Sequence, residues 1–418
     1  MRLSKEELEQ VKKDFNVDKL WSWSKVNTFI TSPYEYYLKY IAHAKEDRQD
    51  CSYATLGSIC HSVLEDFYSG KIKYEEMLDV FEDGWLTAID IVDLKFDRND
   101  ETRNQSIGTK YKNNLLHFFE HHSIVDHISF ENKNDRPKDI LEYKDGQLEL
   151  EQFITANING NIFQGYIDVL YKDYDGVYNI IDWKTSTQYK GKKAEDEAGQ
   201  LVIYAIGLHQ LGIPWDKIRI CWNFLKYVTI RFEQANGTVK YRDVERCKIG
   251  ESLQANAKMW LKKLGYADKI DDYLKQLFDK NDIEVLPDEI QAKYLISDCY
   301  TYVDLTESLI NRWVDTVTIN IKDIELREQD YDKSKNDKLF WDTEESVKAE
   351  SYYFATLCGY SPSLHLPYKK YLEKLEAATN ATDTFSGIGT LINSINSKND
   401  KPICQTSENI DLSWLDEI

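Results

Sequence analysis

Several features that define other protein classes are missing from this sequence. The 418-residue chain has no run of about 18 apolar residues, so no segment is expected to span a membrane. Its seven cysteines are scattered singly without a Cys-x-x-Cys pair, which argues against a disulfide framework or a zinc site. No Gly-x-x-x-x-Gly-Lys-Ser/Thr motif occurs, so the chain is not expected to be a motor by itself. The N-terminal segment is charged and has no apolar signal sequence, which predicts a cytoplasmic protein.

Positive charge is also in short supply. The formal net charge is -20, which argues against general affinity for nucleic acids. The balance reverses between Lys184 and Lys248, where twelve Lys and Arg residues accompany seven Asp and Glu residues. This basic segment is either an ordinary solvated surface or a contact for the phosphate backbone of DNA. Its candidate DNA contacts are Lys190, Lys192, Lys193, Lys226 and Arg231.

Hydrophobic periodicity predicts an α/β core between helical regions. Residues before about 127 have mostly helical spacing, with Ser24 as an expected N-cap and a break at Ser32-Pro33. From about Leu141 the period changes to two, which predicts hairpin strands. An apolar helix and another strand follow residue 184, and this order of elements is typical of an α/β fold.

Two strand-like runs in "GYIDVLYKDYDGVYNIIDWKTS" each contain an aspartate, Asp168 in one and Asp182 in the other. Burying an unpaired carboxylate is costly, and a divalent cation such as Mg2+ offsets that cost because it prefers hard oxygen ligands. Lys184 lies two residues beyond Asp182 and therefore points to the same side of a strand. Its ammonium could orient an attacking water or stabilise developing charge, so the trio suits phosphodiester hydrolysis. Surface salt bridges are the alternative interpretation.

The stretch "LGSICHSVLEDFYSG" adds a candidate imidazole ligand. Helical spacing puts its apolar residues on one face, and His61 and Glu65 lie on the opposite face, one turn apart. As a metal ligand, His61 would complete a His-Asp-Asp site that accepts Mn2+ more readily than an all-oxygen site does. A solvent-facing His–Glu pair is the alternative.

A second polar pair interrupts the apolar helix that contains "QLVIY". Gln200 and Tyr204 are separated by one helical turn, and a polar amide in such surroundings needs hydrogen-bond partners. They either position Lys184 or the scissile strand, or Gln200 is a core glutamine satisfied by the backbone.

These segments together resemble the RecB-type branch of the PD-(D/E)XK nuclease superfamily. That branch includes nuclease domains of bacterial recombination helicase-nucleases, CRISPR adaptation nucleases and many phage exonucleases. The resemblance rests on five motifs that occur in the family's order: "SWSKVNTFITSPYEYYLKY", "LGSICHSVLE", "GYIDVL", "DWKTS" and "QLVIY". It implies a mixed central sheet flanked by helices, with helical additions.

The resemblance also implies a role for each site residue. Mg2+ or Mn2+ would be bound by His61, Asp168, Asp182 and the backbone carbonyl of Trp183. Lys184 would be the catalytic lysine, with Gln200 and Tyr204 as its supporting pair. The serines of the leading motif, Ser22 and Ser24, are expected to cap and brace the fold.

Many relatives also hold an iron–sulfur cluster through four cysteines. Here Ser32 stands at the N-terminal ligand position, and only Cys358 remains among Phe354, Cys358 and Leu364. A cluster needs about four thiolates, so none is predicted. Aromatic packing is expected instead, from Tyr34, Tyr36, Tyr360 and Tyr368.

The nuclease domain is expected to comprise residues 1–250 and 341–376. Residues 251–340 would be an insertion or accessory subdomain, helical with some strand at Thr316–Leu326. Residues 377–418 are rich in Ser, Asn and Thr and predict a flexible tail. Its terminal "IDLSWLDEI" could dock on a replication or recombination protein, or be a frayed end.

The predicted function is a metal-dependent DNA nuclease, with an exonuclease favoured. By resemblance, it would act in recombination, repair or replication, in the cytoplasm of a bacterial cell or a phage-infected host. A structure-specific endonuclease for flaps or branches is one alternative. A DNA-binding accessory protein that keeps the nuclease fold is another, although the intact set of His, two Asp and Lys argues against it.

Overall fold

The computed structural model describes residues 3–98, 100–122, 149–173 and 175–378. It divides into two compact units, each treated separately below. The first unit contains residues 1–24 and 50–319, and the second contains the remainder.

The predicted domain boundaries differ from this division and stay a prediction, because compactness alone does not identify an insertion. The predicted tail lies outside the described residues from 379 onward, as does its terminal peptide. In the described part of the chain, no helix has the length and apolar character needed to cross a membrane.

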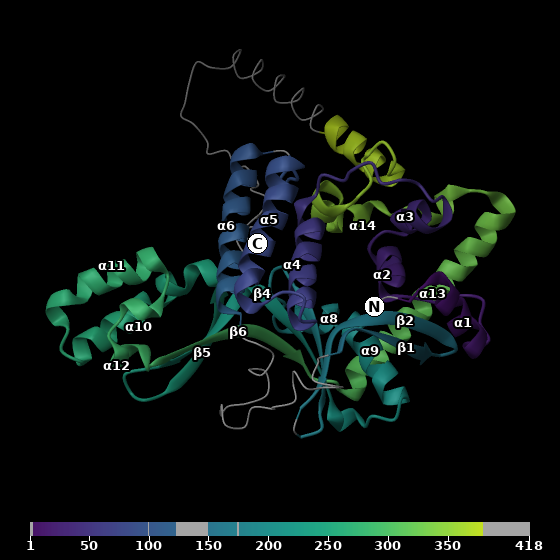
Figure 1. Cartoon of the computed structure of the whole chain (residues 1–418). Coiled ribbons are helices and arrows are strands. Elements are labelled where there is room, and N and C mark those ends of the chain that lie inside the picture. Colours follow the sequence, from purple (N-terminus) through teal and green to yellow (C-terminus); the bar gives the residue numbers. More distant parts are fainter. Residues whose placement is uncertain (1–2, 99, 123–148, 174, 379–418) are drawn as a thin grey trace, which may run out of the picture. The chain divides into compact units, whose positions relative to one another are not determined.

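A mixed sheet of six strands, counted over the described residues, forms the centre of the first unit (Figure 1). The strands are β1 (Glu149–Ile158), β2 (Asn161–Lys172), β3 (Tyr178–Lys184), β4 (Ile218–Glu233), β5 (Val239–Glu245) and β6 (Tyr294–Val303). The order is β1-β2-β3-β4-β5, with β6 also paired to β4. Strands β3 and β4 are parallel, and the other pairs are antiparallel.

Two tight turns set the registers on which the site depends. Asn159 and Gly160 both have positive φ, 52° and 87°, which matches a two-residue hairpin turn between β1 and β2. Between β2 and β3, the Asp173 carboxylate accepts hydrogen bonds from the backbone amides of Asp175 and Val177, at 3.0 and 2.9 Å. The strands that the sequence predicted are therefore joined by short turns.

The connection from β3 to β4 is helical, as a parallel pair requires. It consists of α8 (Lys192–Glu197) and α9 (Gly199–Gln210). Helix α9 packs against β1, β2, β3 and β4, which explains why it is apolar nearly all round.

Three long helices cover the sheet from above in the view of Figure 1: α4 (Ser52–Tyr68), α5 (Met77–Trp85) and α6 (Glu101–His121). Their aromatic and aliphatic side chains form one buried cluster with Val169, Ile181 and Trp183 of the sheet. This cluster is the core beneath the candidate site. Helix α1 (Lys5–Phe15) begins at a Ser4 capping box.

A second cluster lies where the C-terminal half of β4 pairs with β5 and β6. It is formed with α10 (Ile249–Lys263), α11 (Ile270–Lys280) and α12 (Asp288–Gln291). The helical prediction for this region is confirmed.

The strand expected at Thr316–Leu326 is wrong, because these residues lie within the helix α13 (Glu307–Ser334). Their β-branched residues suggested a strand. The buried positions recur every three or four residues, which is the spacing of a helix packed along one face. They are Leu309, Trp313, Val317, Ile321 and Ile324.

The second unit is mostly helical. It includes α3 (Pro33–Tyr36), the last part of α13, α14 (Glu344–Ala349) and a helix at 366–378. Single π-helical turns occur at Tyr37–Ile41 and Tyr353–Leu357. Ser32 caps α3, which confirms the predicted break at Ser32-Pro33. Ser24 is not an N-cap, because α2 (Trp23–Thr31) already begins one residue before it.

A buried polar cluster joins the two sequence segments of the second unit. The Ser32 hydroxyl donates to Asp342 Oδ2 at 3.0 Å and lies 3.0 Å from His365 Nε2. The ring of His365 packs edge-on against Tyr34, with centroids 5.2 Å apart. Polar contacts therefore join these segments, and Tyr34, one of the four tyrosines expected to pack here, adds an aromatic contact.

Candidate active site

A cavity of about 460 Å³ brings together predicted residues from four separate motifs. Its walls come from the N-terminal segment, α4, β1, β2, β3 and α9. The predicted residues that line it are His61, Asp168, Asp182, Lys184, Gln200 and Tyr204. The fold thus assembles in one place side chains that are far apart in the sequence.

The two aspartates are neighbours across β2 and β3. The register pairs Val169 with Ile181, which places Asp168 beside Asp182. Both side chains are buried, and Asp168 Oδ2 accepts a hydrogen bond of 3.0 Å from the backbone amide of Trp183. Burial, and then the nearby charge of Asp182, raise the pKa of Asp168 well above its ordinary value. Two adjacent buried carboxylates therefore call for a positively charged partner.

Lys184 supplies one positive charge. Its Nζ atom lies 2.6 Å from Asp182 Oδ2. Burial acts to lower the pKa of Lys184, but the charge and the hydrogen bond of Asp182, together with the charge of Asp168, hold the pKa above its ordinary value. The ammonium consequently stays protonated at neutral pH.

His61 reaches the same place from α4. Its Nε2 atom lies 3.0 Å from the carbonyl oxygen of Trp183, and its Nδ1 atom lies 3.6 Å from Asp168 Oδ2. Burial lowers the pKa of His61, against the opposing charge of Asp182. The imidazole is therefore inclined to be neutral, which is the form that binds a metal.

The donor chemistry fits a divalent cation. One imidazole, two carboxylates and the carbonyl of Trp183 are the ligand types that Mg2+ or Mn2+ accepts, with water completing the shell. Over the described residues, no three His, Cys, Asp or Glu side chains are already arranged as a metal cage. One expected donor, the carbonyl of Trp183, is a main-chain oxygen and is not counted among such side chains, and Asp182 is paired with Lys184 in this structure.

Gln200 and Tyr204 form the pair that the helical spacing predicts. Gln200 Nε2 donates a hydrogen bond of 2.9 Å to Tyr204 Oη. Burial raises the pKa of Tyr204 to about 12, so its hydroxyl stays protonated. A Cβ atom at Gly165 would lie 2.4 Å from the Tyr204 ring, which explains why this position holds glycine.

Sequence reasoning missed Glu151, which lines the same cavity from β1. It lies between the pairs Leu150–Val169 and Gln152–Ile167, and therefore faces Asp168 across the strands. Its φ of 47° is uncommon for a residue other than glycine. Side chains alternate between the two faces of a strand, and applying this rule to the predicted hairpin could have identified Glu151 as a neighbour of Asp168.

The N-terminal segment forms another wall. The Trp21 amide donates to the Ile162 carbonyl, and the Gln164 amide donates to the Trp21 carbonyl, both at 2.8 Å. These bonds place Ser22, Trp23 and Ser24 at the cavity. The two serine hydroxyls lie 3.1 Å apart, in keeping with a bracing role, but cavity lining was not predicted for them.

The candidate DNA contacts separate into three groups. Lys190, Lys192 and Lys193 are exposed and lie after β3, at the end of a loop and the start of α8. Arg231 is half-buried and does not line the cavity. Lys226 corrects the prediction: it is 6% exposed, with its ammonium 4.6 Å from the Tyr111 ring centroid, so it cannot reach a DNA backbone. Burial lowers the pKa of Lys226 to about 8.

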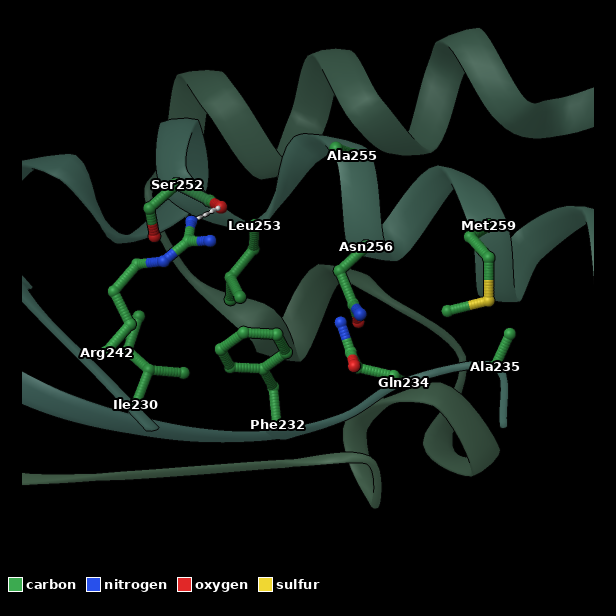
Figure 2. Close-up of a pocket in the computed structure, with 10 residues that line it drawn as sticks. All are labelled: Ile230, Phe232, Gln234, Ala235, Arg242, Ser252, Leu253, Ala255, Asn256 and Met259. Atoms are coloured by element: carbon green, nitrogen blue, oxygen red, sulfur yellow. Dashed lines mark hydrogen bonds between the residues drawn. The ribbon is translucent and has the colours of Figure 1, made fainter. Parts of the chain in front are cut away.

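A second cavity, of about 360 Å³, lies between β4, β5 and α10 (Figure 2). Arg242 lies across the Phe232 ring there and donates to the Ser252 carbonyl at 3.0 Å. Its lining includes no carboxylate, so it does not offer the chemistry of the first cavity.

A family model described as the PD-(D/E)XK nuclease superfamily matches residues 20–286, which is more than half of the chain. The chain therefore belongs to the PD-(D/E)XK nuclease superfamily. Members of this superfamily generally use divalent metals, and membership indicates a metal-dependent nuclease with DNA as its substrate. The predicted fold class is confirmed by this match and by the mixed sheet with its flanking helices. No curated protein matches the chain.

Proposed function

We propose that this protein is a RecB-type, Mg2+- or Mn2+-dependent exodeoxyribonuclease that acts in recombination, repair or replication of a bacterium or phage. The observation that carries the proposal is the convergence of His61, Asp168, Asp182 and Lys184 on one cavity. Two buried carboxylates, a neutral imidazole and a charged ammonium form a rare combination. Burying these charged groups without partners would cost free energy. A bound cation and a bound phosphate would offset that cost.

Each residue has a role that its position supports. His61, Asp168, Asp182 and the carbonyl of Trp183 would hold the metal, which supplies positive charge to the scissile phosphate and lowers the pKa of a bound water. Lys184 would donate a hydrogen bond to a non-bridging phosphate oxygen and stabilise the charge that develops there.

Gln200 and Tyr204 would keep the wall of the cavity in place beside the two aspartates. Their mutual hydrogen bond fixes both side chains, and the close contact of Tyr204 with Gly165 locks the helix against β2. Such fixed neighbours reduce the reorganisation required during the reaction.

The exposed lysines after β3 extend this site toward a DNA backbone. Lys190, Lys192 and Lys193 lie at the end of the loop and in the first turn of α8, which follow the strand that carries Asp182 and Lys184. A protein with a net charge of -20 would bind DNA through such a local basic segment and repel it elsewhere.

The test compares linear duplex DNA, labelled at one end, with covalently closed circular DNA, in Mg2+, Mn2+ or EDTA. An exonuclease digests the linear substrate in either metal, spares the circle and stops in EDTA. Cleavage of the circle, or of a flap at its branch, would instead support the endonuclease alternative. Lys184→Ala is the control for a contaminating nuclease, and its activity must be lost.

If the parent protein bound DNA but cleaved none of these substrates, the result would favour the DNA-binding accessory role. Two further expectations are tested separately. Iron analysis of anaerobically purified protein should find no cluster, and deletion of residues 405–418 should remove any association with a replication or recombination protein.

A further inference from the structure

Trp183 contributes two backbone groups to the candidate site. Its carbonyl oxygen lies 3.0 Å from His61 Nε2, and its amide donates to Asp168 Oδ2 at 3.0 Å. The position of this one peptide segment therefore sets the spacing of the donors around it. Contacts that hold the Trp183 side chain in place therefore help to hold the distances from its backbone to His61 and Asp168.

The indole of Trp183 is held between two rings. It is 2% exposed and packs edge-on against His61, with centroids 5.6 Å apart. The Tyr68 ring lies nearly parallel to it, at 6.1 Å and an angle of 14°. These separations lie within the range of favourable aromatic pairs.

Tyr68 is itself fixed by a buried polar chain. Its hydroxyl lies 2.8 Å from His122 Nε2, and His122 Nδ1 lies 2.8 Å from Asp298 Oδ2. Asp298 Oδ1 pairs with Arg246, whose Nε donates to the Leu225 carbonyl at 2.8 Å. We call Tyr68, His122, Asp298 and Arg246 the Tyr68 network.

The network joins parts of the fold that are distant in sequence. Tyr68 ends α4, His122 follows α6, Asp298 belongs to β6, and Arg246 begins a short turn after β5. All four residues are at most 5% exposed. Burial acts to raise the pKa of Asp298, but Arg246 and then His122 hold it below its ordinary value, so the charge persists.

A buried ion pair is a poor way to stabilise a core, because well-packed apolar residues do as well or better. Satisfied polar networks do rigidify what they contact. Here the rigid end of the network is a ring lying against the residue that carries an expected metal donor. This placement favours a role in geometry over a role in stability alone.

We propose that Tyr68 is a positioning residue for the metal site, and that the Tyr68 network fixes Trp183 so that its carbonyl stays directed at the cation. The inference rests on the proposed function. The network would act like the residues at other metal centres that contact the metal ligands without binding the metal themselves. Removing such residues commonly weakens metal binding about 10–100-fold.

The test measures Mn2+ binding to the full-length protein by isothermal titration calorimetry, without DNA. Tyr68→Phe keeps the ring and removes the hydroxyl, whereas Tyr68→Leu removes the stacked ring. The matched control is Tyr74→Phe, because the Tyr74 hydroxyl donates to the His122 carbonyl at 2.7 Å and is not part of the chain to Trp183. Thermal unfolding is followed for every variant.

Tyr68→Phe should weaken Mn2+ binding several-fold and Tyr68→Leu about tenfold or more, while Tyr74→Phe keeps the parent affinity despite a similar loss of stability. Equal weakening by Tyr68→Phe and Tyr74→Phe, or parent affinity in Tyr68→Phe, would overturn the inference. If the parent itself bound no Mn2+, the proposed metal site would be wrong and this inference with it. Tyr68→Phe decides the matter even if Tyr68→Leu does not fold.

Discussion

The candidate site and the buried cluster of the second unit use similar residues in opposite ways. The site directs His61, Asp168, Asp182 and Lys184 into a cavity. The second-unit cluster of Ser32, Asp342 and His365 has the composition of a hydrolase triad but is closed off. Ser32 and His365 are both 0% exposed.

Hydrogen bonding separates the two regions further. His365 Nδ1 accepts from the Tyr368 amide at 3.2 Å, and burial lowers the pKa of His365 to about 4. The neutral ring therefore carries its proton on Nε2, toward Ser32, and cannot take a proton from that hydroxyl. Residue types alone do not define a catalytic site; access and the direction of each proton do.

The largest expected effect is on catalysis at the open site. Lys184→Ala should lower the cleavage rate by about 10²–10³-fold or more, because the developing phosphate charge loses its ammonium. A metal-dependent assay on end-labelled linear DNA measures this rate. Cooperative unfolding should be retained, and a rate near that of the parent would show that Lys184 is not catalytic.

A substitution in the closed cluster should lower the free energy of unfolding and leave the cleavage rate unchanged. His365→Ala leaves Asp342 and Ser32 buried without their partner and should lower the free energy of unfolding of this region by about 3–5 kcal/mol. Urea denaturation provides the measurement. His365→Gln restores a donor and should recover part of the loss. A large fall in cleavage rate in a folded His365→Ala protein would place the cluster in the mechanism after all.

The two lysines Lys184 and Lys226 extend the same comparison, because Lys184 borders the cavity and Lys226 is buried. Lys184 has a carboxylate partner, whereas Lys226 forms no ion pair with any described residue, and burial lowers its pKa to about 8. Between pH 8 and about 10.5 the unfolded chain binds the extra proton, so stability should rise with pH in that window. Lys226→Met should flatten this rise and stabilise the protein at pH 7 by about 1–3 kcal/mol. An unchanged pH profile of unfolding would contradict the assignment.

The smallest expected effect is on DNA affinity. Lys193→Ala should weaken binding uniformly across sequences and reduce the slope of log K against log salt by about one. Fluorescence anisotropy at several salt concentrations provides the measurement. Lys226→Met is the matched control and should leave the slope unchanged. If Lys226→Met lowered the slope and Lys193→Ala did not, Lys226 would contact the DNA backbone after all.

Much of the open site could be predicted because its signals are local. Two aspartates in apolar strands, a lysine two residues later and a polar pair one helical turn apart are visible without coordinates. Strand pairing then places Asp168 beside Asp182, as the hairpin pattern required. The role of each residue remains a proposal, but the juxtaposition follows from period and turn chemistry.

The remainder depends on contacts between distant segments, which no local pattern encodes. Tyr68 and His122 look like ordinary core residues until α4, α6 and β6 pack together. The prediction for Lys226 considered its charge without its neighbours. Leu225 and Tyr227 on one side of the strand, and Phe224 and Val228 on the other, indicate a strand buried on both faces. In α13, β-branched composition outweighed helical spacing in the prediction and gave the wrong element.

The most direct test of the account is Mn2+-dependent cleavage of linear duplex DNA by Asp182→Asn beside the parent protein. Asparagine keeps the size of the side chain and removes the charge that pairs with Lys184 and that we propose binds the cation. The variant should fold and show no metal-stimulated cleavage at any Mn2+ concentration at which the parent is active. Cleavage by Asp182→Asn at the rate of the parent would contradict it.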